Sequence, residues 1–164
     1  MHIARSAVLS LFAVVGLATP ALAAAYTCTG QTLGTTVIPD GAGPITIDGC
    51  TYTGALTVGT VNSGTTVTIT GSTLKLGIYF SQDLSNVDVS VAGTAIPVGS
   101  GTTTAFRWTN LLSGSTMSLD AVTITGMGIG IYALDVAAGC SVSFNNVDMV
   151  VDRHGIELFA LGGH

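Results

Sequence analysis

The residues best suited to chemistry lie near the C-terminal end of the chain. Five charged side chains share one short stretch: Asp148, Asp152, Arg153, His154 and Glu157. Carboxylates beside a histidine can perform acid–base catalysis, and carboxylate oxygens bind Ca²⁺. Asp120 would lie near Asp148 and Asp152 if successive segments stack, but the six or more oxygen ligands of a calcium site are not identifiable. We therefore expect a solvated corner, and we assign no catalytic residue, no metal ligand and no cofactor.

The elements that would position these residues repeat along the chain. Three apolar positions recur after 25 residues, Met117 as Val142, Val122 as Val147 and Ile131 as Ile156. Earlier segments repeat the same three short runs of alternating apolar and small polar residues, and no window has a helical period. A repeat of about 20 to 50 residues with three strands and no helix predicts a stacked architecture. We predict an all-β, single-stranded parallel β-helix of about five rungs, with three short strands per rung.

Alternation predicts which side chains point into the core, and they form three columns. The first column contains Ile45/Ile47, Val67/Ile69, Val87/Val89, Met117/Leu119 and Val142/Phe144. The second column contains Tyr52, Leu74/Leu76, Ile96/Val98, Val122/Ile124 and Val147/Met149. The third column contains Leu56/Val58, Ile78/Phe80, Phe106/Trp108, Ile131/Ala133 and Ile156/Leu158. The glycine-rich segment 126–130 is predicted to be a tight corner between strands, because no helix follows it to form a phosphate-binding loop.

One residue argues against this prediction. Pro97 falls within a predicted strand, where it would remove a backbone donor. The alternative fold is an antiparallel β-sandwich, which is also built from short alternating strands. A sandwich gives no reason for three strands to recur in the same order, so we prefer the β-helix.

The two ends of the chain indicate how it is organised. Residues 1–23 have a basic start, an apolar run and a small-residue finish, the pattern of a secretory signal peptide. No later stretch reaches the roughly 20 apolar residues of a spanning helix, so we expect a secreted or surface-associated protein without a transmembrane segment. Residues 24–44 are turn-rich and are predicted to cap a β-helix of residues 45–164. This β-helix looks truncated, and its last, open rung predicts self-association through unpaired strand edges.

Charge and cysteine content narrow the partners further. After loss of the signal peptide, three cations face nine acidic residues, a net charge of −6. Binding to nucleic acid requires clustered cations, so we expect no nucleic-acid partner. In an oxidising compartment we prefer a disulfide between Cys28 and Cys50, which both lie in the irregular N-terminal region. Cys140 is then either packed inside as a small hydrophobe or available to another chain.

One face carries side chains suited to binding. The residues between the inward pairs of the third column are Thr57, Tyr79, Arg107, Tyr132 and Glu157, and alternation points them outward. Arg107 would lie between two tyrosines in cation–π contact, and sugar rings also stack on aromatic faces. We predict that Tyr79, Arg107, Tyr132 and Glu157 contact a glycan or a cell-surface protein. The alternative is a ladder that only solubilises this face.

Two known families resemble this coil pattern. The segments GSTMSLDAVTITGMGIGIYAL and GCSVSFNNVDMVVDRHGIELF resemble coils of the pectin-lyase-like right-handed parallel β-helix superfamily, and the likeness covers Ile45 to Phe159. The low charge and the Val, Thr and Gly texture look like the kinetoplastid dispersed gene family of long, adhesin-like surface proteins. In β-helical polygalacturonases a Gly-His-Gly-Ile motif is catalytic, and His154-Gly155-Ile156 matches part of it. The accompanying Asn-Thr-Asp and paired-Asp motifs are absent from the chain.

We expect a non-enzymatic protein whose flat, hydroxyl-rich faces serve surface interaction or adhesion, which is also the role that the resemblance to the dispersed gene family implies. One alternative is a degenerate or specialised polysaccharide lyase or hydrolase. A second alternative is a truncated fragment without an independent function.

Overall fold

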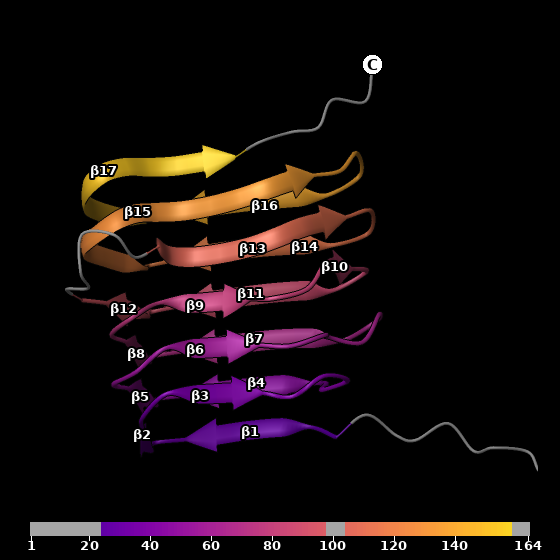
Figure 1. Ribbon diagram of the computed structural model, residues 1–164, viewed down its shortest axis with the longest axis horizontal. Coiled ribbons are helices and arrows are strands. Elements are labelled where there is room, and N and C mark those ends of the chain that lie inside the picture. The colour runs from indigo at the N-terminus through magenta and orange to yellow at the C-terminus, as the bar shows by residue number, and fades with distance from the viewer. Residues whose placement is uncertain (1–23, 98–103, 159–164) are drawn as a thin grey trace, which may run out of the picture.

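The chain winds into a stack of β-coils (Figure 1). The computed structural model describes residues 24–97 and 104–158, so the predicted signal peptide, residues 1–23, lies outside the described residues. Among the described residues there is no helix, and the strand pairs are parallel. The predicted single-stranded parallel β-helix is confirmed.

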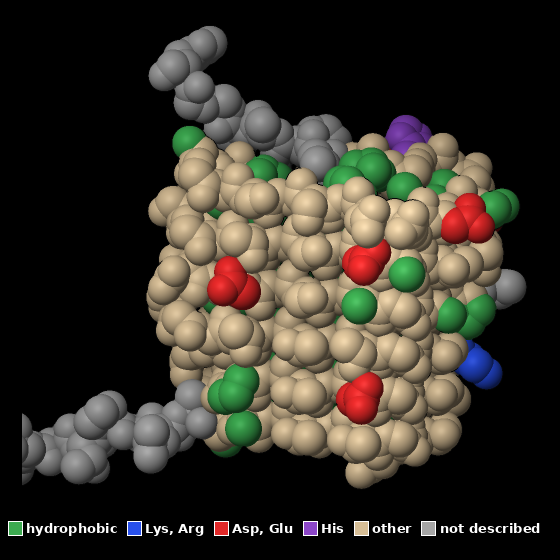
Figure 2. Space-filling model, turned by 180° about the vertical axis from the view of Figure 1, so that it is seen from behind, with side chains coloured by type: hydrophobic (Ala, Val, Ile, Leu, Met, Phe, Trp, Pro, Cys, Tyr) green, Lys and Arg blue, Asp and Glu red, His purple; other side chains and the backbone are tan. Residues whose placement is uncertain are grey.

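One strand of each coil belongs to a six-stranded sheet, here called the first sheet. Its strands, in spatial order, are β1 (Tyr26–Thr29), β4 (Ile45–Asp48), β7 (Thr66–Thr70), β11 (Asp88–Ala92), β14 (Thr116–Asp120) and β16 (Ser141–Asn145). Inward side chains such as Ile45 and Ile47 are completely buried, whereas Thr46 between them is exposed. Figure 2 shows the outer side of this sheet from behind, where acidic and hydrophobic side chains are few and most of the surface is backbone or other side chains.

The other strands form a second, eleven-stranded sheet. The strands that follow the first sheet in each early coil are short: β2 (Thr32–Leu33), β5 (Thr51–Tyr52), β8 (Thr73–Leu74) and β12 (Ala95–Ile96). The strands that complete these coils are β3 (Thr36–Ile38), β6 (Leu56–Val58), β9 (Ile78–Phe80) and β13 (Thr104–Leu112). A short strand, β10 (Leu84–Ser85), pairs with the end of β13.

The last two described coils differ from the predicted three strands per rung. In each of them one long strand replaces two short ones: β15 (Thr123–Val136) and β17 (Asp148–Leu158). The segment 126–130, predicted to be a tight corner, lies inside β15. Register shifts between β15 and β17 occur between Thr125 and Met127 and between Met127 and Ile129. The prediction of a corner was therefore wrong, because bulges let the strand bend without ending.

The segment assigned to an N-terminal cap contains strands in register with the next coil. Within residues 24–44, β1 pairs with β4, β2 with β5 and β3 with β6. Cys28 of β1 is bonded to Cys50, which follows β4, so the predicted disulfide is confirmed and joins the first coil to the second. Residues 24–44 thus form the first coil of the stack.

The register of the third predicted column agrees with the structure in every rung, and its side chains are buried in every rung before the last. Phe106 pairs with Ile78 on one side and with Ile131 on the other, and Ile131 pairs with Ile156. The first column is displaced in one rung, where Val89 rather than Val87 pairs with Val67. Because Val87, Val89 and Val91 have the same spacing, alternation identifies the inward set but does not fix which members are neighbours.

The second column contains a similar displacement. Ile96 pairs with Ile124 rather than with Val122. Leu76, predicted to point inward, is 40% exposed. Pro97 follows β12, which ends at Ile96, so the proline removes no donor from this strand. Val98 lies outside the described residues.

Each turn out of the first sheet passes through one residue with a left-handed backbone. These residues share φ values between 49° and 62°: Gly30, Gly49, Gly71, Gly93, Ala121 and Asn146. The corner amides continue the ladder between coils, as when the Gly93 amide donates to the Asp120 carbonyl at 3.0 Å. Among these six corner residues, the left-handed conformation is sterically most unfavourable for Ala121. Glycine has no Cβ, and asparagine tolerates the left-handed region.

Candidate functional site

The third column positions an outward ladder on the second sheet. Tyr79 on β9, Arg107 on β13 and Tyr132 on β15 are direct register partners on neighbouring strands. We call these three residues the Tyr–Arg–Tyr ridge. Phe106 and Trp108 on either side of Arg107 are completely buried, so they anchor the strand with the arginine facing outward.

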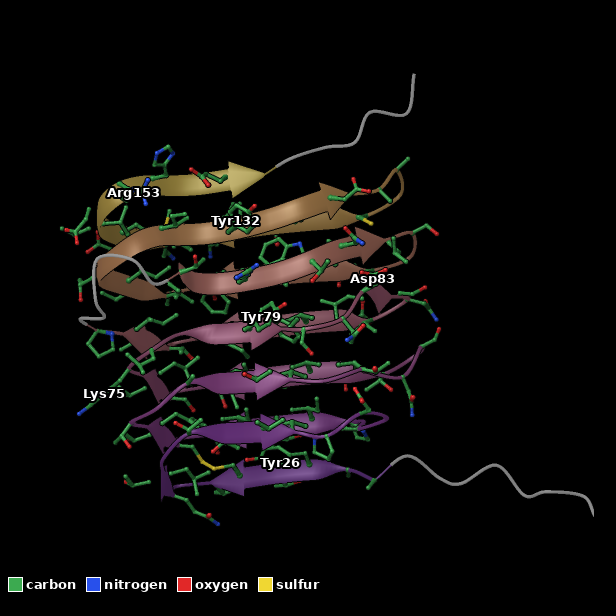
Figure 3. The ribbon with its side chains drawn as sticks, in the orientation of Figure 1. Tyr26, Lys75, Tyr79, Asp83, Tyr132 and Arg153 are labelled. Carbon is green, nitrogen blue, oxygen red and sulfur yellow. A yellow bond between two sulfur atoms is a disulfide. The ribbon has the colours of Figure 1, made fainter. Side chains whose placement is uncertain are left out.

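Arg107 is held by both tyrosines. Its guanidinium carbon lies 4.9 Å from the centre of the Tyr79 ring and 5.7 Å from that of Tyr132, within the range of cation–π attraction. The arginine is exposed and both tyrosines are half-buried. Figure 3 shows Tyr79 and Tyr132 on the same side of the stack. The ridge therefore presents aromatic edges and a planar cation to solvent in a fixed arrangement.

Two hollows adjoin the ridge. The larger, of about 300 Å³, is lined by side chains that include Ala55, Thr57, Leu76, Tyr79, Thr104 and Arg107. The smaller, of about 220 Å³, is lined by Thr104, Arg107, Ile129 and Tyr132. Since Thr104 and Arg107 line both, the hollows adjoin each other along the axis of the stack. The lining combines hydroxyl, aromatic and aliphatic groups with one guanidinium.

A polar group of residues follows the ridge along the same strands. The Asn110 amide donates to the Asp83 carboxylate at 2.7 Å, and Asn110 is the register partner of Asp135. In Figure 3, Asp83 lies beyond Tyr79 in the direction of the strand arrows. Groups that accept and donate hydrogen bonds thus border the ridge on this side.

Glu157, the fourth predicted binding residue, lies at the end of the ladder. It is the register partner of Tyr132, and its carboxylate forms an ion pair with His154 Nδ1. Its side chain is only 19% exposed. Glu157 therefore extends the ladder by one coil but already has a partner within its own strand.

The remaining charged residues of this segment do not converge on one point. Asp148, Asp152 and Arg153 are exposed along β17, and Asp120 accepts a hydrogen bond from the Asn145 amide at 2.7 Å. In the described part of the chain, no three His, Cys, Asp or Glu side chains are grouped so that they could hold a metal ion. Gly155 occupies the same position as Gly130 and Ala105 in the preceding coils, so the repeat accounts for its place beside His154.

Cys140 is half-buried at the corner before β16. Its sulfur lies 3.1 Å from the Leu111 carbonyl oxygen and 3.0 Å from that of Leu112. One coil earlier, the Ser115 hydroxyl donates to the Leu84 carbonyl at 3.0 Å and accepts from the Val87 amide. The thiol of Cys140 therefore contacts backbone carbonyl oxygens at the corner where, in the preceding coil, the hydroxyl of Ser115 donates a hydrogen bond to a carbonyl.

Sequence reasoning missed four residues that line the hollows. Leu76 was placed inward by alternation, and Ala55, Thr104 and Ile129 were given no role in binding. The only sequence signal for Thr104 was its place two residues before the apolar pair of the third column. It follows an irregular segment of which residues 98–103 lie outside the described residues. Such a signal does not indicate a hollow, because the hollow depends on side chains of neighbouring coils.

Comparison with known proteins identifies no relative of this chain. No protein-family model, curated protein or solved structure matches the chain. The resemblances to the pectin-lyase-like superfamily and to the kinetoplastid dispersed gene family stay predictions. No helix in the described ranges is long and apolar enough to cross a membrane.

Proposed function

We propose that this chain is a secreted or surface-associated, non-enzymatic β-solenoid that binds a glycan or a cell-surface protein through the Tyr–Arg–Tyr ridge. The observation that carries the proposal is the stacking of Arg107 between Tyr79 and Tyr132 on an outer face, beside two hollows. Aromatic rings and arginine are the side chains that most often dominate binding energies at interfaces.

The chemistry of the hollows favours binding over catalysis. Hydrolysis of a glycosidic bond ordinarily uses two carboxyl groups on opposite sides of the bond. The side chains that line the hollows in the described chain are instead hydroxyl, aromatic, aliphatic and guanidinium groups. A polysaccharide lyase or hydrolase is the alternative function, and it would require acid–base groups contributed from elsewhere.

The disulfide supports export. Disulfides persist in oxidising compartments and are rare in the cytosol, and the Cys28–Cys50 bond ties the first two coils together. This fits the signal peptide predicted for residues 1–23.

The proposal is tested by replacing Tyr79, Arg107 and Tyr132 together with serine. Binding of the purified protein to arrayed glycans and to intact cell surfaces is compared with that of the unchanged chain, and a polysaccharide-cleavage assay is run beside it. The matched control replaces Thr46, Thr68 and Ser90, three outward residues of the first sheet, with alanine.

We expect the ridge variant to lose binding and the control variant to keep it, with circular dichroism unchanged in both. Equal binding by the two variants would place the contact on another face. Cleavage activity that survives in the control and releases sugar products would establish the enzymatic alternative.

A further inference from the structure

We infer that the ligand of the ridge is an uncharged, unbranched glycan that lies along the axis of the stack in the two hollows. This inference rests on the proposed function and adds the class and orientation of the ligand. Four features carry it: the direction of the hollows, the paired state of the backbone beneath them, the charges around them and their apolar lining.

The hollows set the direction of the ligand. The larger one includes Thr57, Tyr79 and Arg107 from three consecutive coils, and the smaller one continues to Tyr132 on the next. Three steps between neighbouring strands correspond to about 14 Å. A ligand that fills both hollows is therefore elongated and crosses the strands, and it passes Thr104 and Arg107, which the two hollows share.

The paired backbone disfavours a peptide in this direction. On this face β9 pairs with both β6 and β13, and β13 pairs with both β9 and β15, so these strands offer no free edge. A peptide lying across them could not add a strand to the sheet, which is how extended peptides gain most of their backbone hydrogen bonds. Its buried amides would go unpaired, which would weaken the binding of a peptide. A glycan instead presents hydroxyl groups that both donate and accept, and these suit Thr57, Thr104 and the tyrosine hydroxyls.

The charges around the ridge favour an uncharged ligand. Asp83, Asp135 and Glu157 border it, and the chain without its signal peptide carries a net charge of −6. An anionic polymer along the stack would be repelled by these carboxylates. A cationic polymer would meet Arg107 at the centre of its path. A neutral ligand avoids both costs and leaves the guanidinium free to donate hydrogen bonds to hydroxyl oxygens.

The lining matches the mixed character of sugar rings. Leu76 is 40% exposed in the larger hollow, and Ile129 is half-buried in the smaller one. The C–H faces of a sugar ring pack on such aliphatic groups and on tyrosine rings, while its hydroxyl groups point toward the polar border.

The experiment measures binding of unbranched hexasaccharides of glucose, N-acetylglucosamine, xylose, mannose and galactose by titration calorimetry. Hexagalacturonate and the hexamer of glucosamine serve as anionic and cationic comparators. One variant, Thr104→Tyr, places a large side chain where the two hollows meet and leaves the three ridge residues unchanged. Its matched control is Thr109→Tyr, on the same strand but lining neither hollow.

We expect at least one neutral hexasaccharide to bind, and to bind more tightly than either charged comparator. Affinity should be nearly independent of salt, because no ion pair is formed. It should increase with oligosaccharide length until the groove is filled. Thr104→Tyr should weaken this binding tenfold or more, equivalent to about 1.4 kcal/mol, while Thr109→Tyr leaves it unchanged.

Three outcomes would overturn the inference. They are tighter binding of a charged comparator, equal effects of the two tyrosine variants, and the absence of any response to the neutral sugars. If a cell surface is still bound in a manner that needs the ridge, the proposed function stands and only the class of ligand is wrong. If no surface is bound at all, the proposed function fails as well.

Discussion

Ala121 occupies a backbone conformation that its side chain disfavours. Its φ is 50°, where an alanine Cβ lies too close to the following carbonyl oxygen, at a cost of about 1 to 2 kcal/mol. We expect Ala121→Gly to raise the free energy of unfolding by about 0.5 to 1 kcal/mol, since part of the gain is offset by the greater freedom of glycine when unfolded. Urea denaturation measures this change.

The matched variant is Gly93→Ala, at the same corner one coil earlier. Gly93 has a φ of 56°, and a Cβ there would meet no atom closer than 3.9 Å. Only backbone strain should therefore act, and we expect a loss of about 1 kcal/mol. A gain in the alanine variant, or a loss in the glycine variant, would contradict this account of the corner column.

Tyr52 makes the fold sensitive to alkali. It is completely buried, and burial, together with its hydrogen bond to the Tyr26 hydroxyl at 3.1 Å, raises its pKa above the ordinary value of 10.0. The folded state then favours the neutral phenol. The stability that Tyr52 contributes is complete below pH 10.0 and is lost as the pH rises through the folded pKa, by up to about 1.4 kcal/mol per pH unit.

The test is Tyr52→Phe. This variant should lose about 1 kcal/mol at neutral pH, because the Tyr26 hydroxyl loses its partner. Above about pH 10 its free energy of unfolding should fall less steeply than that of the unchanged chain. Urea denaturation across this range, with refolding at neutral pH to verify reversibility, provides the comparison. Identical alkaline slopes would show that Tyr52 does not titrate in the unfolding equilibrium.

At the scale of elements, the disulfide secures the first coil. Cys28 in β1 and Cys50 after β4 are 22 residues apart in sequence. Replacing both with serine should lower the free energy of unfolding by about 3 kcal/mol. Because coils of a solenoid contact mainly their neighbours, faster hydrogen exchange should concentrate in β1, β2 and β3. The control is Cys140→Ser, which should preserve stability, and a uniform rise in exchange along the chain would refute the local effect.

The sequence was sufficient to predict the coil architecture and the third column, and with it the order of the ridge. In that column each rung offers one triplet of two inward residues that flank one outward residue. Only one alignment of the five rungs therefore places every triplet in register. The first column failed at Val87 and Val89 because a slip of two residues leaves every side chain on its original face. The hollows could not be predicted, since they depend on the space between Leu76 and Thr104 on different coils.

At the scale of the whole molecule, the last described coil is less buried than the coil before it. Phe144 and Ile156 in the last described coil are 37% and 42% exposed, whereas their partners Leu119 and Ile131 in the preceding coil are completely buried. We expect the 164-residue chain to associate with itself through this coil, because exposed apolar groups beside strand edges favour pairing. Light scattering over a range of concentrations measures it.

The variant that tests this association is Phe144→Lys combined with Ile156→Lys. Two charges at this end should shift the equilibrium toward the monomer. A matched control, Val37→Lys, removes an apolar side chain that is 67% exposed in the first coil and should leave the association unchanged. A monomer at every concentration in the unchanged chain would rule out the contact.

The position of the disulfide has a mechanical consequence. If the chain binds a surface as we propose, it bears load, and among the described coils a disulfide cross-links only the first two. A pulling force applied to the two ends of the chain should therefore unfold the coils one at a time, starting from the C-terminal end. The coil from Met117 to Val142, which contains 25 residues, would release roughly 85 Å of extended chain. A single-molecule pulling trace would then show a series of steps of roughly 75 to 95 Å, because the coils between Ile45 and Val142 contain 22 to 28 residues. The two coils joined by the disulfide would be the last to unfold.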